Sequence, residues 1–112
     1  MPVVAAASTP KTEIAPKRER YLAHTDHLMV VVIDFADGPM SEPDPPHSHP
    51  HEQVTYVASG ELIFYIEDKP HTLREGDLIT VAPNLPHTIQ LLTETCRLVD
   101  TFTPLRDEFI EG

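Results

Sequence analysis

Residues 47–60 read HSHPHEQVTYVASG, and this stretch carries most of the information about fold and chemistry. In a β-strand, side chains two residues apart point to the same face, so His47 and His49 can direct both imidazoles at one point. Gln53 lies four residues beyond His49, again at an even spacing. Imidazole is the commonest metal ligand in proteins, and two imidazoles at this spacing form a chelating edge. The stretch therefore predicts inward-facing metal ligands at the start of a strand that closes at Gly60.

A second histidine-bearing stretch lies downstream, where residues 76–87 read GDLITVAPNLPH. Pro83 and Pro86 make a tight corner, and His87 opens the strand that follows, from which it can close the site from across a barrel. Spacing alone leaves plainer readings open. A His-x-His-x-His run on an exposed loop is solvated or binds metal adventitiously, and a single histidine such as His87 is commonly structural.

The rest of the chain reads as short strands separated by turns. Residues 30–33 form a β-branched run, and residues 61–66 alternate with their large apolar side chains on one face. Residues 36–46 contain four prolines and three acidic residues, which predicts a stiff loop and excludes a central strand. About ten short strands and no convincing helix indicate an all-β sandwich or barrel.

A chain of 112 residues is expected to form one domain. We divide it into an N-terminal arm, residues 1–20, and a barrel domain, residues 21–112. The arm mixes small, proline and charged residues, and it reads as a loose terminus or as a segment that packs on a partner subunit. Because a chain of this length buries only a small core, association would help to stabilise it, and we expect a homodimer.

The overall charge restricts the class of partner. A formal net charge of -10 argues against nucleic acid and against an anionic membrane surface, because both reward positive charge. A small anionic substrate remains compatible, since a metal ion and one arginine reverse the field locally. Cys96 is the single cysteine, so no intrachain disulfide can form, and a reducing, cytoplasmic setting fits. No apolar run approaches membrane-spanning length.

The two histidine stretches together resemble the two sequence motifs of the cupin family. In the first motif H-x-H precedes a glutamate and then a glycine, and the matching residues here are His47, His49, Gln53 and Gly60. In the second motif a glycine precedes a histidine by eleven positions, as Gly76 precedes His87. The resemblance implies an all-β cupin fold, the double-stranded β-helix or jelly-roll barrel. It also implies one divalent metal ion held by His47, His49, Gln53 and His87.

Gln53 stands where the cupin motif has glutamate, and this changes the charge of the site. Glutamine offers a carbonyl oxygen without a negative charge, so the charge of a divalent ion is not cancelled by the protein. Such a site favours an anionic ligand and Lewis-acid chemistry, and it disfavours a higher metal oxidation state. The nitrogen and oxygen ligands suit nickel, zinc, iron, cobalt or manganese.

The last predicted strand carries polar residues in inward positions. Asp100 and Phe102 share strand parity with Leu98, so all three face the barrel if Leu98 does. A buried aspartate is costly unless it is paired or functional, and near a metal it can donate or accept protons. Arg106 follows the strand and can fold back to clamp a carboxylate. The alternative is that Asp100 faces solvent and that Arg106 forms a surface pair with a neighbouring acidic residue.

The four metal ligands, combined with Asp100, Phe102 and Arg106, resemble the KdgF pectin-degradation cupins. That family converts 4,5-unsaturated uronates into open-chain keto-uronates. The resemblance implies that Asp100 is the acid–base residue and that Phe102 and Arg106 position a sugar acid. It therefore favours a metal-dependent enzyme that linearises unsaturated uronates. Two alternatives stay open: a metal-dependent dioxygenase of the cupin class, and a non-catalytic cupin that binds a small ligand.

Overall fold

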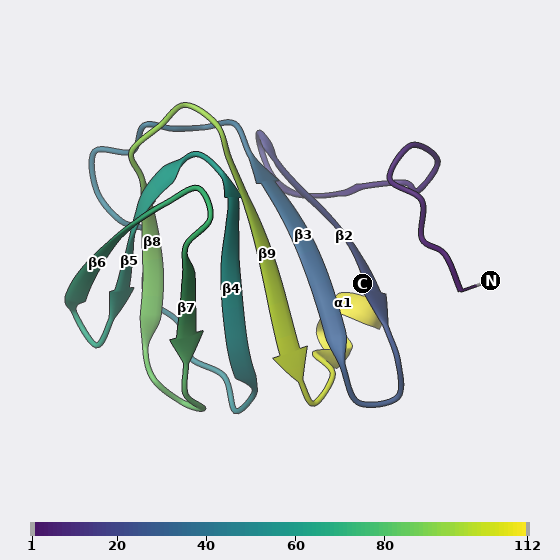
Figure 1. Ribbon diagram of the computed structural model, residues 1–112. Coiled ribbons are helices and arrows are strands. Elements are labelled where there is room, and N and C mark those ends of the chain that lie inside the picture. The colour runs from purple at the N-terminus through teal and green to yellow at the C-terminus, as the bar shows by residue number, and fades with distance from the viewer. Residues whose placement is uncertain (1, 112) are drawn as a thin grey trace.

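The computed structural model describes residues 2–111, which form nine strands and one short helix (Figure 1). The elements are β1 (Thr12–Ala15), β2 (Arg18–His24), β3 (Met29–Phe35), β4 (Glu52–Ser59), β5 (Glu61–Ile66), β6 (Lys69–Arg74), β7 (Leu78–Val81), β8 (His87–Leu91), β9 (Cys96–Thr103) and α1 (Asp107–Glu111). The expected all-β fold is confirmed. The helix, which the sequence patterns did not indicate, begins with two acidic residues that favour a helix N-terminus.

The strands form two antiparallel sheets. The larger sheet has the order β1-β2-β3-β9-β4-β7, and the smaller has the order β6-β5-β8. Figure 1 shows β9, from the end of the chain, lying between β3 and β4. This central position brings the C-terminal residues next to the first histidine stretch.

The hydrophobic core lies between the inward faces of the two sheets. Its main cluster of buried side chains comprises Phe35, Val57, Leu62, Phe64, Leu73, Val81, Leu91, Cys96 and Leu98. A second cluster of Met29, Val31 and Phe102 packs with Leu22, Leu105 and Phe109. Burying one large side chain of this kind contributes about 1.5–3 kcal/mol. The second cluster holds the C-terminal segment against the larger sheet.

The predicted parity of the last strand is correct. Along β9 every second residue is buried, and these are Cys96, Leu98, Asp100 and Phe102. The strand therefore presents an aspartate and a phenylalanine to the interior of the fold, and the solvent-facing alternative for Asp100 is excluded.

The proline-rich loop between β3 and β4 runs alongside β8. The amide groups of Gly38, Met40 and Asp44 donate hydrogen bonds to carbonyls of Glu94, Leu91 and Ile89. His47 then exchanges two backbone hydrogen bonds with His87, at 3.0 and 2.8 Å. Proline has no backbone N–H group, but the residues that donate these hydrogen bonds are not prolines. The loop thus delivers His47 directly opposite His87.

The N-terminal segment differs from the expected arm, because its second half is part of the larger sheet. β1 and β2 pair with each other, and β2 pairs with β3 from Arg18↔Phe35 to His24↔Met29. The expected division at residue 20 therefore falls inside β2. Charged residues obscured the strand in the sequence, because Arg18 reaches Asp37 and Asp44 at 2.9 and 2.6 Å and is held at the sheet by these ion pairs.

Candidate metal centre

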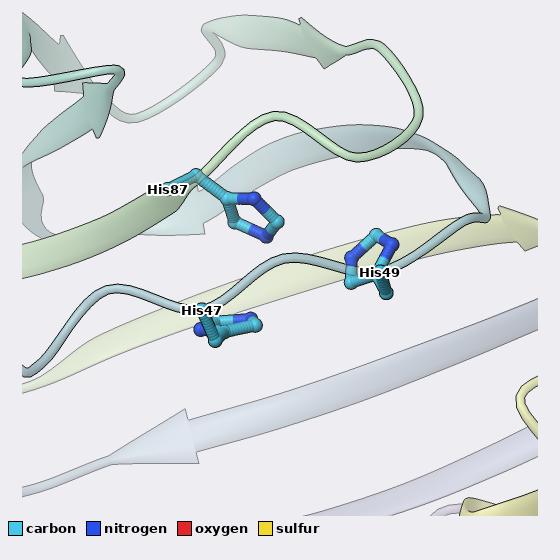
Figure 2. A group of neighbouring side chains, drawn as sticks. All are labelled: His47, His49 and His87. Atoms are coloured by element: carbon cyan, nitrogen blue, oxygen red, sulfur yellow. The ribbon is translucent and has the colours of Figure 1, made fainter.

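Three histidines from two segments meet at one point, where His49 and His87 are buried and His47 is exposed. His47 and His49 lie just before β4, and His87 is the first residue of β8. Each contributes one ring nitrogen to a group whose members lie within 4.8 Å of one another. Figure 2 shows the three rings converging from the two neighbouring segments. The structure thus brings together the three histidines that the sequence singled out.

The hydrogen bonds of His87 leave one nitrogen free to bind a metal. Its Nδ1 lies 2.8 Å from the carbonyl oxygen of Leu85, which can only accept, so Nδ1 carries the proton. Nε2 then holds a lone pair, and within the described residues this buried atom has no hydrogen-bond partner. A buried unpartnered lone pair beside two other imidazoles is what a metal ligand requires.

Gln53, the first inward residue of β4, lies beside His49. Its Oε1 is 2.9 Å from Nε2 of His49, and both side chains are buried. An amide oxygen can only accept, so Nε2 of His49 carries the proton, and its buried Nδ1 is the nitrogen without a hydrogen-bond partner within the described residues. The hydrogen bond holds the amide oxygen of Gln53 beside the imidazoles, where it can join them as a ligand. The donor set of three imidazoles and one amide oxygen suits a transition metal.

The electrostatics of the site keep the imidazoles neutral, as metal binding requires. Desolvation, together with the charges of His87 and Arg106, lowers the pKa of His47 to about 4. Desolvation also lowers the pKa values of His49 and His87. A proton does not compete with a metal for these nitrogens near neutral pH.

Asp100 lies on β9 opposite Thr55 of β4 and is 8% exposed. Burial raises the pKa of Asp100 to about 6, although the Thr55 hydrogen bond and the charge of Arg106 both act to lower it. The Thr55 hydroxyl donates to Oδ1 of Asp100 at 2.7 Å. A carboxyl group with this pKa can hold or release a proton near neutral pH, as an acid–base residue must.

A cavity of about 430 Å³ is lined by all the predicted site residues except His49. Its lining includes His47, Gln53, His87, Asp100, Phe102 and Arg106. The Arg106 side chain is only 15% exposed and pairs with Glu108 at 2.9 Å. The guanidinium of Arg106 also lies over the ring of Phe102, 5.1 Å from its centroid. Arg106 therefore forms the expected local ion pair and also faces the cavity.

His51 is not part of the three-histidine group, although it belongs to the same sequence run. Its Nε2 lies 3.1 Å from the carbonyl oxygen of Leu105 and donates to it. His51 thereby fastens the residue before Arg106 to the start of β4. In this structure His51 therefore contacts the C-terminal segment rather than the three-histidine group.

The sequence analysis did not identify the cavity residues that come from β2 and from the C-terminal helix α1. Arg18 and Arg20 of β2 line the same cavity, as does Phe109 of α1. The Phe109 ring lies 3.9 Å from the guanidinium of Arg20 and 4.2 Å from that of Arg106. The signal was present in the two-residue spacing of the arginines, which places both on one face of a strand.

Comparison with known proteins identifies the family of this chain. A family model described as a cupin domain matches residues 31–102. The chain belongs to the cupin family. This cupin is 34% identical, over 94 residues, to the pectin degradation protein KdgF of Dickeya dadantii, and the match covers 83% of each chain.

Solved structures confirm the predicted jelly-roll fold of this cupin. An RmlC-like cupin from Shewanella frigidimarina superposes with a TM-score of 0.84 and 31% identity, covering 95% of this chain and 93% of the other. KdgF from Halomonas sp. also superposes with a TM-score of 0.84, at 27% identity and 94% coverage of both chains. Among residues 2–111, no helix has the length and apolar character needed to cross a membrane.

Proposed function

We propose that this cupin is a metal-dependent enzyme that opens the ring of 4,5-unsaturated uronates, the sugar acids that lyases release from pectin or alginate. The single observation that carries the proposal is the cavity that two imidazoles of the three-histidine group line together with a buried carboxyl group and a largely buried guanidinium. Similarity to a pectin degradation protein over most of the chain supports this substrate class.

Arg106 is the proposed anchor for the uronate carboxylate. A guanidinium offers two parallel donors that match a carboxylate, and the low exposure of Arg106 strengthens such a bond. Phe102, buried on β9 beneath this guanidinium, provides an apolar surface for one side of the sugar ring. Arg20 adds a second positive charge on the same cavity wall. Together these residues hold an anionic sugar in one orientation.

Asp100 is the proposed proton carrier. Linearisation breaks the bond between the ring oxygen and the anomeric carbon, turns the anomeric hydroxyl into an aldehyde with loss of its proton, and leaves the former ring oxygen as an enolate. The enolate becomes a ketone when a proton reaches the former alkene carbon C4. Because its pKa is about 6, Asp100 can accept the hydroxyl proton and return a proton to C4, so the protons balance over one turnover.

His47, His49, Gln53 and His87 are the proposed ligands of one divalent transition metal ion. When bound, the ion supplies Lewis-acid polarisation of substrate oxygens. Because all four ligands are neutral, the full positive charge remains available to an anionic substrate. Nickel, zinc, iron, cobalt and manganese all suit this donor set.

The test is the loss of alkene absorbance from an unsaturated galacturonate monomer. Metal-loaded protein should remove the absorbance well above the spontaneous rate, and chelated protein should not. Arg106→Gln should raise KM strongly, whereas Arg97→Gln on the preceding strand β9 should behave as wild type. Arg97 is a matched control because it pairs with Asp34 at 2.7 Å and does not line the cavity.

The alternatives give different results in the same set of measurements. A dioxygenase would consume oxygen with its substrate, which an oxygen electrode detects, and a binding module would retain the sugar acid unchanged. If fully metallated wild-type protein leaves the alkene absorbance unaltered, the uronate proposal is wrong.

A further inference from the structure

Thr55 lies between the proposed metal ligand Gln53 and the proposed proton carrier Asp100. It is fully buried on β4, with 0% of its surface exposed. The Nε2 atom of Gln53 lies 2.8 Å from the Thr55 hydroxyl oxygen, and that hydroxyl lies 2.7 Å from Oδ1 of Asp100. One side chain therefore connects the metal centre to the acid–base group.

The chain of hydrogen bonds has a defined direction. A hydroxyl has one proton, and a carboxylate can only accept, so the Thr55 proton goes to Asp100. The Thr55 oxygen must then accept, and the donor that reaches it is the amide nitrogen of Gln53. This fixes the rotation of the Gln53 amide, because its nitrogen faces Thr55 and its oxygen faces His49. On Asp100 this hydrogen bond engages Oδ1, and the residue also lines the cavity.

The same direction explains why glutamine can serve at position 53 where the cupin motif has glutamate. A glutamate has no proton to give to Thr55, so its carboxylate would compete with Asp100 for the single hydroxyl proton. Two carboxylates around one buried hydroxyl also repel each other. Glutamine is a ligand on one side and a donor on the other, which is what this arrangement needs.

We propose that Thr55 is a positioning residue that orients Gln53 toward the metal and Oδ1 of Asp100 away from the substrate. The part that concerns Asp100 rests on the proposed activity, whereas the part that concerns Gln53 rests only on the proposed metal site. Outer-shell partners of metal ligands commonly change metal affinity or activity by about 10–100-fold.

The first measurement is Zn²⁺ affinity, determined by competition with a chromophoric chelator. Thr55→Val keeps the shape of the side chain but removes the hydroxyl, and it should weaken Zn²⁺ binding by about 10–100-fold. Thr55→Ser keeps the hydroxyl and should stay within about threefold of wild type. An equal loss in both variants would assign Thr55 a packing role, and no loss in Thr55→Val would remove its link to Gln53.

A second measurement reads the Gln53 amide directly in the metal-free protein. In ¹⁵N-labelled wild type, one of the two Gln53 amide protons should be shifted and protected from exchange, because it is bonded to Thr55. The signature should persist in Thr55→Ser and vanish in Thr55→Val. If it is the same in all three proteins, the inferred direction of the chain is wrong.

A third measurement, of enzyme kinetics, separates this inference from the proposed function. If wild type opens unsaturated uronates, Thr55→Val saturated with Zn²⁺ should lose kcat by about 10–100-fold with little change in KM, and Thr55→Ser should restore it. If wild type has no such activity, the proposed function fails, and the Zn²⁺ affinities still decide whether Thr55 positions Gln53.

Discussion

At the scale of single residues, the raised pKa of Asp100 suits its proposed role in proton transfer, but the buried carboxylate lowers the stability of the folded protein. Its pKa of about 6 lies above the ordinary value of 3.8 because the carboxyl group is buried. Between these two values the folded state binds more protons than the unfolded state, so this residue's contribution to stability falls as the pH rises. Above pH 6 the folded protein holds a buried charge that the unfolded chain would solvate.

Asp100→Asn should therefore stabilise the metal-free protein at pH 8. The expected gain is about 1–3 kcal/mol, because one pKa unit corresponds to about 1.4 kcal/mol and asparagine still accepts from Thr55. Urea unfolding of the two chelated proteins measures the difference, which should shrink as the pH approaches 4. An asparagine variant that is less stable than wild type at pH 8 would show that the buried carboxylate is not costly.

The sequence predicted the grouping of the candidate metal ligands better than it predicted their supporting contacts. Strand parity and the resemblance to the cupin motifs depend on local spacing, and they selected His47, His49, Gln53 and His87, of which the three histidines come together in the structure. The position of Thr55 opposite Asp100 is a property of the register between β4 and β9. Residues that lie 45 positions apart carry no pairing signal that one sequence reveals, so the connection between metal site and acid–base group required the structure.

At the scale of elements, the proline-rich loop is held so closely against its neighbours that one position admits only glycine. A Cβ atom at Gly38 would lie 1.9 Å from the carbonyl oxygen of Thr93, which is backbone and cannot rotate away. Gly38→Ala must therefore displace the loop that leads to His47. We expect a loss of about 1–3 kcal/mol in stability, together with weaker metal binding.

Thermal unfolding with and without Zn²⁺ measures both effects of the glycine substitution. Ser41→Ala, at an exposed position of the same loop, is the matched control and should match wild type. A Gly38→Ala protein that keeps its melting temperature would mean that the loop and the segment at Thr93 separate without cost.

A second prediction at this scale concerns Arg20 of β2. Within the described side chains no carboxylate lies in salt-bridge range of Arg20, and Arg20 faces the cavity beside Arg106. Desolvation and the charge of Arg106 lower the pKa of Arg20, so an anion that binds between them relieves a repulsion. Arg20→Met should raise KM for a uronate by about tenfold with a smaller effect on kcat, since it removes binding rather than chemistry.

The control for Arg20 is Lys17→Met, which removes one positive charge from the β1–β2 turn outside the cavity. Steady-state kinetics on both variants separate a local effect from a change in net charge. Equal KM values in the two variants would remove Arg20 from the binding site. Sequence analysis placed the first part of β2 in the arm because its charged residues lack the apolar alternation that identifies buried strands.

At the scale of the whole molecule, the fold was predictable because turns and short strands recur along most of the chain. The part that could not be predicted is how the sheet edges are completed. A loop with four prolines runs beside β8 as an extra edge, and a charged strand extends the larger sheet beyond β3. Both depend on backbone groups that any residue except proline supplies, so side-chain patterns carry little trace of them.

The expected homodimer remains a proposal, and the outer face of the larger sheet offers a surface for it. Val54 and Tyr56 on β4 are each 40% exposed, and Leu78, which pairs with Tyr56, is 64% exposed. These neighbouring apolar side chains lie on the opposite face of β4 from Gln53 and Thr55. Covering them in a dimer would remove apolar surface from water without blocking the cavity.

Tyr56→Asp combined with Leu78→Asp should therefore convert a dimer into a monomer, because two buried carboxylates on each side would repel across a two-fold interface. Sedimentation velocity measures the mass, and Zn²⁺ affinity should stay within about threefold, since the substitutions face away from the metal site. The matched control Glu52→Ala removes an exposed charge from the same strand and should leave the mass unchanged. A variant that sediments as wild-type dimer would place the interface elsewhere, with the N-terminal segment as the next surface to test.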